Sequence, residues 1–519
     1  MQSINKDNRL FYIVTLLGFI TLLFSNPFLR YPYDMIFHLI VIDDIYTQIP
    51  TGEIEQVQLE KARYLWHYLW AKLFFWLNID STQLLLRAKI IHIIQTSISL
   101  ASIYYFSNVI LRNIFKHIEN IQLKWLSLWS VVIWITLFAT FSAAYHQVWI
   151  MWYSVNYQIT LPLFWYMLGL TLVLLLEQKQ ISWKIKVFFI LQIIGFSRFI
   201  LQVHSMEFMY YLMHIFILSL IFIDEVYLLL KKYFYIIIPI IILIIFIAKN
   251  YQPEKSAIFR YLSLEQAPKL YDRIMESGTI LLNGYNRASA SINEVMYFIL
   301  FLGTIFIFYI LWNIYKQQQI NIHMRVLLFT IITSMFVLIP LYQFSGGLFG
   351  LITRTSVVHR LYYSSSLFVL IPVFFYAIFY KYKLRYLHIA ISSSLIVIIL
   401  FSKYNDVLHH NYYKNILSIK NSFFEKKIGF NLNQNQINTI KKEIENYEKN
   451  NISNKKIRYY ARADIAFVIK TLFHKNVYWE GRRKNPDYIK IYKKNINNTQ
   501  YKHILFKIPK NFPPYSPYT

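Results

Sequence analysis

The chain has 519 residues, of which 56% are hydrophobic and only 15% are charged, and its formal net charge is +27. The apolar residues form long runs separated by short basic clusters, which is typical of a polytopic membrane protein rather than a water-soluble one. The chain contains no cysteine, and this excludes disulfides, thiolate metal sites and cysteine nucleophiles.

Runs long enough to cross about 30 Å of hydrocarbon predict about eleven transmembrane helices. They are expected at Leu10–Leu29, Ala88–Leu111, Trp125–Ala144, Ile159–Leu176, Lys186–Val203, Phe208–Leu230, Tyr233–Ala248, Glu294–Tyr315, Arg325–Phe344, Tyr362–Tyr380 and Tyr386–Phe401. The predicted fold is therefore a polytopic α-helical membrane domain at residues 1–402, followed by a small soluble α/β domain at residues 403–519.

The distribution of basic residues predicts the orientation. Every loop on one side contains Lys or Arg, from Lys6 near the N-terminus to Arg385 before the last span, whereas the short loop 145–158 on the other side has neither. Basic loops stay in the cytoplasm, so we expect a multi-pass protein of the cytoplasmic (inner) membrane with its N-terminus inside. An odd number of spans then places the C-terminal domain outside.

The first outer segment, residues 30–87, directly follows the first span and carries Asp34, His38, Asp43 and Asp44. In a helix Asp34 and His38 lie one turn apart on one face, and the other two carboxylates lie a right angle or more around the axis. Charge beside a membrane span is costly and commonly functional. A carboxylate there can act as a general base, or Asp43 and Asp44 can hold a divalent cation such as Mg²⁺ or Mn²⁺ against a lipid phosphate.

The same segment contains a second helical pattern at residues 61–76. Its large apolar side chains recur at spacings of three and four and are Trp66, Leu69, Trp70, Leu73 and Phe74. This pattern predicts a helix lying in the membrane interface. We interpret its tryptophans as packing residues rather than sugar-binding ones.

Three other outer segments carry candidate substrate-binding residues. Trp149 and Trp152 could stack against a pyranose face, and a later loop offers guanidinium and imidazole groups for a phosphate. Arg198, inside an apolar span, is predicted either to pair with Glu207 or to line a wet cavity. The candidate substrate contacts are His38, Trp149, Trp152, Glu207, Arg354, His359 and Arg360.

The tail, residues 403–519, has 23 basic and 8 acidic residues, a net charge of +15. Such a surface favours anionic headgroups or a phosphate-bearing lipid, and an external location argues against nucleic acid as a partner. We expect a helix at Ile437–Lys449, a strand at Ile457–Tyr460, a helix at Ala463–Phe473, and strands at Asp487–Tyr492 and Tyr501–Ile508.

This arrangement of spans, with an acidic pair (Asp43 and Asp44) after the first, an Arg-bearing late outer loop and an external tail, resembles the GT-C superfamily. Its members are integral-membrane glycosyltransferases that use lipid-linked donors. The resemblance covers the membrane part and is greatest to bacterial enzymes that build or decorate surface polysaccharide. It implies a polyprenyl-phosphate-linked sugar donor and a glycan or lipid acceptor. It makes Asp34, Asp43 or Asp44 the base or metal ligand, and Arg354 or Arg360 the phosphate clamp.

One departure and two alternatives accompany this prediction. The tail lacks the Trp-Trp-Asp type of motif of oligosaccharyltransferases, the nearest string being Tyr478-Trp479-Glu480-Gly481, which argues against protein N-glycosylation. A polysaccharide polymerase or ligase would share the span count and the basic outer loops. A transporter or flippase would need ionisable residues within the spans, where Arg198, Asp224 and Glu225 are the candidates, and an internal repeat, which is not evident.

Overall fold

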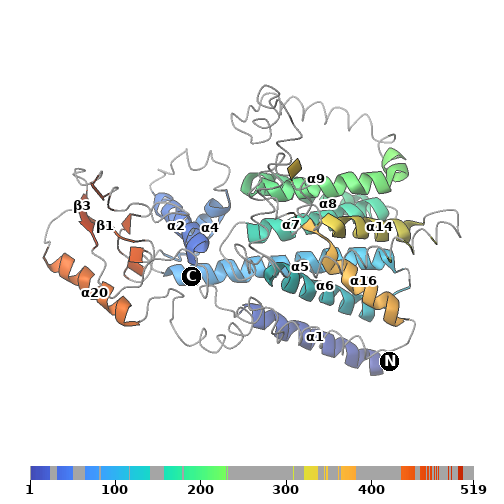
Figure 1. The fold of residues 1–519 in the computed structure, drawn as a ribbon, viewed down its shortest axis with the longest axis horizontal. Helices are drawn as coiled ribbons and strands as arrows, with labels where there is room; N and C mark the ends of the chain where they lie inside the picture. Colours follow the sequence, from blue (N-terminus) through green and yellow to red (C-terminus); the bar gives the residue numbers. More distant parts are fainter. Residues whose placement is uncertain are drawn as a thin grey trace. The chain divides into compact units, whose positions relative to one another are not determined.

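The computed structural model is mostly helical, with one small β-sheet near the C-terminus (Figure 1). It describes residues 2–23, 32–50, 65–80, 83–115, 117–140, 157–177, 180–228, 321–336, 364–380 and 434–450, parts of 456–506, and a few isolated residues elsewhere. Contacts divide the chain into two compact units. One comprises residues 1–19, 98–149 and 160–413, and the other comprises residues 20–97, 150–159 and 414–519.

Eight of the predicted spans overlap with described helices. These are α1 (Gln2–Leu23), α5 (Leu84–Ile114), α6 (Asn120–Thr140), α7 (Tyr157–Leu176), α8 (Trp183–Val203), α9 (Ser205–Ile221), α14 (Ile322–Ser334) and α16 (Leu367–Tyr380). The expected spans Tyr233–Ala248 and Tyr386–Phe401, and most of Glu294–Tyr315, lie outside the described residues. The total of eleven therefore stays a prediction.

Within the described part of the chain, three helices are long and apolar enough to cross a membrane: Leu86–Ile114, Ile159–Leu176 and Trp183–Val203. Shorter apolar helices lie at Phe11–Ile20, Met206–Ile221, Ile322–Ser334 and Leu367–Ala377. The helical membrane character that composition predicts is thus supported by the helices themselves.

Helices α7 and α8 differ in how much of their apolar surface is covered. In its most apolar stretch 72% of α7 is buried, against 6% of α8. Phe188, Leu191 and Ile194 of α8 are exposed, so this helix presents hydrocarbon where a lipid chain would meet it. By contrast, α7 approaches α5 closely, because Gly169 leaves room for the ring of Tyr105, which a Cβ at this position would meet at 3.0 Å.

One set of helix ends in the first unit is joined by polar contacts. Arg112, in the last turn of α5, pairs with the carboxylate of Glu177, which directly follows α7, at 2.8 Å. The Nδ2 of Asn113 also donates to Glu177, at 3.1 Å. His323, at the start of α14, donates through Nδ1 to the carbonyl of Asn113 at 2.6 Å. The C-terminal ends of α5 and α7 therefore lie beside the N-terminal end of α14.

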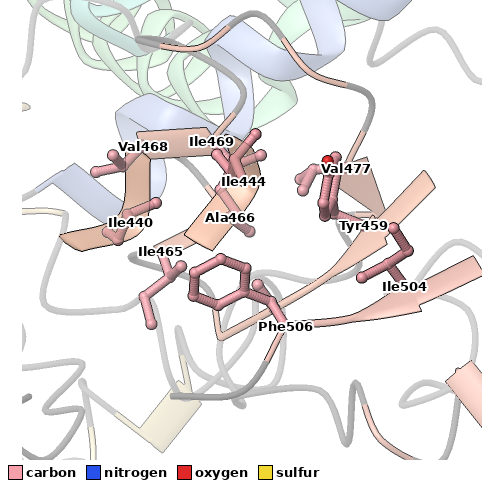
Figure 2. Close-up of a cluster of buried hydrophobic side chains, with 11 residues drawn as sticks. Ile440, Ile444, Tyr459, Ile465, Ala466, Val468, Ile469, Val477, Ile504 and Phe506 are labelled. Carbon is pink, nitrogen blue, oxygen red and sulfur yellow. The ribbon is translucent and has the colours of Figure 1, made fainter. Parts of the chain in front are cut away.

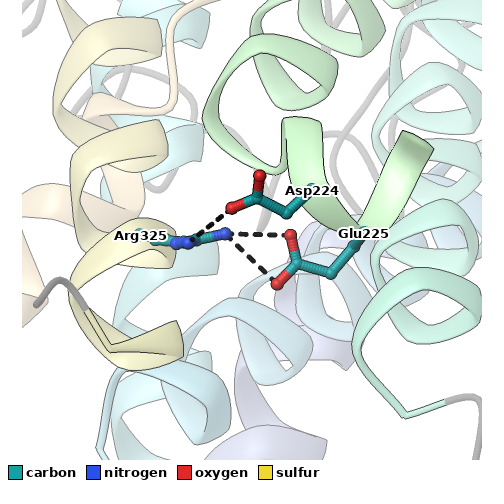
Figure 3. Close-up of polar contacts among 3 residues, drawn as sticks. All are labelled: Asp224, Glu225 and Arg325. Atoms are coloured by element: carbon teal, nitrogen blue, oxygen red, sulfur yellow. Dashed lines mark hydrogen bonds and ion pairs between the residues drawn. The ribbon is translucent and has the colours of Figure 1, made fainter. Parts of the chain in front are cut away.

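An ion-pair cluster extends this polar layer. Arg325 of α14 donates through Nη1 to both carboxylate oxygens of Glu225, at 2.9 and 3.2 Å, and through Nη2 to Asp224 at 3.3 Å. Figure 3 shows the guanidinium reaching from α14 to the helical segment 223–228, which follows α9. The segment that follows α9 therefore lies beside the N-terminal end of α14, in the same layer of polar contacts.

The opposite end of α14 contacts the start of α16 through buried hydroxyls. Thr333 and Ser366 are hydrogen-bonded at 2.6 Å, Ser366 donates to the carbonyl of Thr330, and Ser365 donates to the carbonyl of Ser334. These five side chains are at most 1% exposed. Small hydroxyl residues let two backbones approach closely and satisfy their own hydrogen bonds away from water.

The tail contains a three-stranded parallel sheet in the order β2-β1-β3. Its strands are β1 (Lys456–Tyr460), β2 (Val477–Tyr478) and β3 (Tyr501–Leu505), and helix α20 spans Gln434–Lys449. The strands expected at 457–460 and from 501, and the helix ending at 449, are confirmed. The strand expected at Asp487–Tyr492 is wrong, because its described residues Ile489 and Tyr492 are helical. Short alternating runs do not separate strand from helix by periodicity alone.

A hydrophobic cluster packs α20 and the segment 465–469 against this sheet (Figure 2). The face of α20 that takes part is formed by apolar residues spaced three or four apart, Ile437, Ile440, Ile444 and Tyr447. The sheet contributes Tyr459, Val477 and Ile504. The tail thus contains a hydrophobic cluster between helix and sheet, while a separate C-terminal domain and its boundary at residue 403 stay predictions.

Candidate functional site

The acidic stretch after the first span forms helix α2, Pro32–Gln48. Proline suits the first helical position because its fixed φ is already helical and its missing N–H would have no partner there. The buried residues of α2 recur at helical spacing and are His38, Leu39, Ile42, Asp43 and Ile45. An apolar helix face here therefore carries two polar groups into its packing interface.

Helix α4, Leu65–Trp76, packs against α2. Its buried face is formed by Trp66, His67, Trp70, Ala71 and Phe74. The predicted apolar stripe is confirmed for both tryptophans and for Phe74, whereas Leu69 is 49% exposed. The face is shifted because His67 and Ala71, which are not large apolar residues, also pack inward.

The end of α4 is fixed by Asn78, whose φ of 53° lies in the left-handed region. The N–H of Ile79 donates to the carbonyl of Phe74, and the N–H of Asn78 donates to that of Phe75. These two bonds make a Schellman motif, in which asparagine is a common substitute for glycine. The motif turns the chain so that the carbonyl of Ile79 becomes an acceptor for a side chain of α5.

That side chain is Arg87, which is 0% exposed. Its Nε and Nη2 donate to the carbonyl of Ile79, at 3.1 and 2.6 Å, and its Nη1 donates to Oδ1 of Asp43 at 2.8 Å. The guanidinium carbon also lies 4.0 Å from the centre of the Tyr46 ring and 5.3 Å from that of Phe74. A single arginine thus connects α2, α4 and the first turn of α5.

A buried ion pair of this kind constrains geometry more than it adds net stability. Taking both charges out of water costs several kcal/mol, and good hydrogen bonds only offset that cost. Removing one partner is much worse, about 3–5 kcal/mol, because the other charge is left buried without compensation. The Asp43–Arg87 pair therefore strongly favours the one arrangement of α2 on α5 in which both charges are satisfied.

A second polar contact joins α2 to α4. Nδ1 of His38 and Nε2 of His67 are 2.7 Å apart, and both side chains are 1% exposed. The indole of Trp66 packs edge-on against both imidazoles and donates through Nε1 to Gln95 of α5 at 2.6 Å. Polar groups buried this deeply need partners, and these partners come from all three helices.

The predicted site residues are described to different extents. His38 and Asp43 lie in the buried interface between α2, α4 and α5. Asp34 and Asp44 belong to α2, but their side chains are outside the described part. The candidates Trp149, Trp152, Arg354, His359 and Arg360 lie wholly outside the described residues. Their assignment stays a prediction.

Glu207 is buried at the start of α9 and pairs with Nδ1 of His204. Arg198, the predicted partner of Glu207, is exposed near the C-terminal end of α8. A long arginine stem close to a helix end can extend its charge to the membrane surface without a buried partner. The contact of this acid is therefore with a neighbour three residues away in the sequence.

The described side chains include only one half of the predicted cation site, because the side chain of Asp44 lies outside them. Among them no group of three His, Asp or Glu residues could hold a metal ion. Oδ1 of Asp43 is already bound by the guanidinium of Arg87, and a fixed positive charge beside a carboxylate disfavours a second cation there.

Three polar residues of this interface were not singled out from the sequence: His67, Arg87 and Gln95. His67 lies within a run of aromatic residues, and Arg87 stands at the edge of a predicted span, where it reads as a headgroup anchor. The sequence signal for Arg87 is its position one turn inside an apolar helix, where a buried guanidinium needs an acidic partner.

No protein-family model and no curated protein matches the sequence.

Proposed function

We propose that this chain is a membrane glycosyltransferase. It transfers a sugar from a polyprenyl-phosphate-linked donor to a glycan or lipid acceptor at the outer face of the cytoplasmic membrane. The observation that carries the proposal is helix α2, which follows α1 directly, contains Asp34, Asp43 and Asp44, and is held in place by the buried Arg87. Carboxylates on a rigid element beside a membrane span suit a general base for a lipid-linked substrate.

Each candidate residue has a role in the proposed reaction. One carboxylate of α2 takes the proton of the acceptor hydroxyl, whose oxygen attacks the anomeric carbon from the side opposite the carrier phosphate. The bond between the anomeric carbon and the phosphate oxygen breaks, and polyprenyl phosphate leaves with the electron pair. Arg354 and Arg360 would bind the departing phosphate, with His359 beside them, while Trp149 and Trp152 would hold the sugar ring. The outcome is inversion at the anomeric carbon.

The polar layer of the helical unit supports the orientation on which this proposal depends. Alternation of the expected spans requires the C-terminal ends of α5, α7 and α9 and the N-terminal end of α14 to share one side of the membrane. The contacts of Arg112, His323 and Arg325 join these four ends. The basic loops next to them favour the cytoplasmic side. The predicted order of spans, in which α2 follows the first one, then predicts the outer side for α2.

The same contacts favour an enzyme over a transporter. Asp224 and Glu225, two of the ionisable residues that a transport pathway would need, are both engaged by Arg325. Both carboxylates lie in the polar layer at the helix ends, whereas a transport pathway would need ionisable residues within the spans.

The proposal is tested by replacing Asp34, Asp43 and Asp44 singly with asparagine. The variants, in isolated membranes, are given synthetic undecaprenyl-phosphate-linked glucose, galactose or mannose, and release of undecaprenyl phosphate is followed. Loss of one catalytic base is expected to lower the rate by about 10²–10⁴-fold. Full activity of all three variants at normal expression would refute the role of α2.

A further inference from the structure

We propose that Asp43 and Arg87 are positioning residues of the proposed transfer site, and that the base is Asp34 or Asp44. This inference rests on the proposed function and assigns roles among its three carboxylates. It follows from the contacts of the pair, its burial and the way α4 ends.

The hydrogen-bonding capacity of Arg87 is used to fix helices rather than to meet a ligand. Its Nε, Nη1 and Nη2 groups are each engaged, two with the carbonyl of Ile79 and one with Asp43. The rings of Tyr46 and Phe74 cover the guanidinium, and none of its side chain is exposed. Arg87 therefore has no surface left for a substrate phosphate.

Asp43 is unsuited to proton abstraction for a related reason. Its side chain is 8% exposed and its Oδ1 accepts a charge-assisted hydrogen bond at 2.8 Å. A general base must come within hydrogen-bond distance of the proton that it removes. Asp43 faces the packed interior of the three helices, where an acceptor hydroxyl would have to displace Arg87.

The pair nevertheless determines where the other two carboxylates lie. Asp34 and Asp44 belong to the same helix as Asp43, so any rotation or lift of α2 moves all three together. Misplacement of a catalytic group by about 1 Å can cost about 10²-fold in rate. A residue that fixes α2 should therefore affect turnover without touching the substrate.

The test uses paired substitutions. Asp43→Asn and Arg87→Gln each break the charge pair, whereas the double variant Asp43→Asn/Arg87→Gln restores a neutral amide pair with a donor and an acceptor. We expect each single variant to lower kcat by at least about tenfold, which corresponds to about 1.4 kcal/mol, and the double variant to recover most of the loss. A double variant as inactive as Asp43→Asn would show that Asp43 itself takes the proton.

A second readout does not require activity. Because the chain has no cysteine, Ala71→Cys introduces a unique thiol on the buried face of α4, and Lys72→Cys gives a matched exposed control next to it. Maleimide labelling at position 71 should be slow with the native pair, at least about tenfold faster in each single variant, and slow again in the double variant. Labelling at position 72 should be fast throughout.

The two readouts separate the two proposals. If no polyprenyl-phosphate sugar is turned over but labelling follows the expected order, the proposed function is wrong, although the pair still holds α2 against α4. Labelling that is unchanged in both single variants would overturn the positioning role. If Arg87→Gln does not accumulate, Arg87→Lys replaces it, since Lys keeps the charge but cannot donate to Asp43 and Ile79 as a planar fork.

Discussion

Asn78 ends helix α4 in the left-handed region, and the bonds on either side of it direct the carbonyl of Ile79 to Arg87. Glycine has no steric penalty there, whereas a β-branched residue does. Asn78→Gly should therefore change stability by only a few tenths of a kcal/mol, and Asn78→Val should lower it by about 1–2 kcal/mol. Thermal unfolding of the intact protein in detergent measures both, and equal midpoints for the two variants would contradict the assignment.

Tyr459 should make the stability of the tail depend on pH in the alkaline range. Its burial raises the pKa of the phenol above the usual value of about 10, and Glu448, which accepts its hydrogen bond at 3.4 Å, raises it further. A raised pKa in the folded state means that the stabilisation is complete below about pH 10 and is lost as the pH rises beyond it. Protease resistance of the tail should therefore begin to fall above about pH 10.

Tyr459→Phe is the control for this effect. Phenylalanine fills the same space between α20 and the sheet but has no proton to lose, so the alkaline loss of protease resistance should be smaller in the variant. A pH profile identical to that of the native chain would assign the effect to lysines instead.

At the scale of single residues, only one member of the Asp43–Arg87 pair could be identified from the sequence. Asp43 could be singled out because an acidic residue after a membrane span is unusual. Arg87 could not, because its role depends on a contact with a residue 44 positions earlier and on the turn at Asn78. Spacing along one helix predicts neighbours on that helix and says little about contacts between helices.

At the scale of helices, the contacts of Arg325 predict which of two adjacent carboxylates contributes more to stability. Glu225 accepts two hydrogen bonds and is 30% exposed, whereas Asp224 accepts one at 3.3 Å and is 74% exposed. Exposed pairs contribute about 0–1 kcal/mol, and less exposed charge-assisted hydrogen bonds contribute more. Glu225→Gln should therefore lower the unfolding midpoint in detergent clearly more than Asp224→Asn, which should be close to neutral. The reverse order would contradict the geometry in Figure 3.

The elements themselves were largely predictable. Long apolar runs indicated the membrane helices, and the spacing of Trp66, Trp70 and Phe74 indicated α4, because each signal repeats over several turns. The run Asp487–Tyr492 is too short for such a repeat. Its alternation predicts a strand but does not exclude a helix. The buried hydroxyl contact between α14 and α16 had no signal at all, since serine and threonine are equally common in loops.

For the whole molecule, the sequence predicts a polytopic membrane protein, and the described helices support that. The predicted orientation in the membrane can be tested directly, because the chain has no native cysteine. In intact cells a membrane-impermeant maleimide should label Lys72→Cys, in the predicted outer segment, but should label Asp224→Cys only after permeabilisation. Labelling of Asp224→Cys in intact cells would reverse the orientation and would move α2 to the cytoplasmic face.

The chemistry could be predicted only as far as a set of residue types. Carboxylates after the first span and arginines in a predicted late outer loop suit a lipid-linked sugar donor, but whether they converge depends on segments far apart in the chain. Within the described part, the structure contributes the buried Asp43–Arg87 contact that joins α2 to α5.

The most direct test of lipid-linked sugar transfer uses the purified chain in lipid nanodiscs with undecaprenyl-phosphate-linked hexoses and a membrane glycolipid extract as acceptor. Release of undecaprenyl phosphate is measured by mass spectrometry for the native chain and for Asp34→Asn/Asp44→Asn. The account predicts release by the native chain and a loss of at least about 10²-fold in the variant. Equal release by both would contradict it. So would no release by the native chain when slow labelling of the Ala71→Cys variant reports an intact α2–α4 interface.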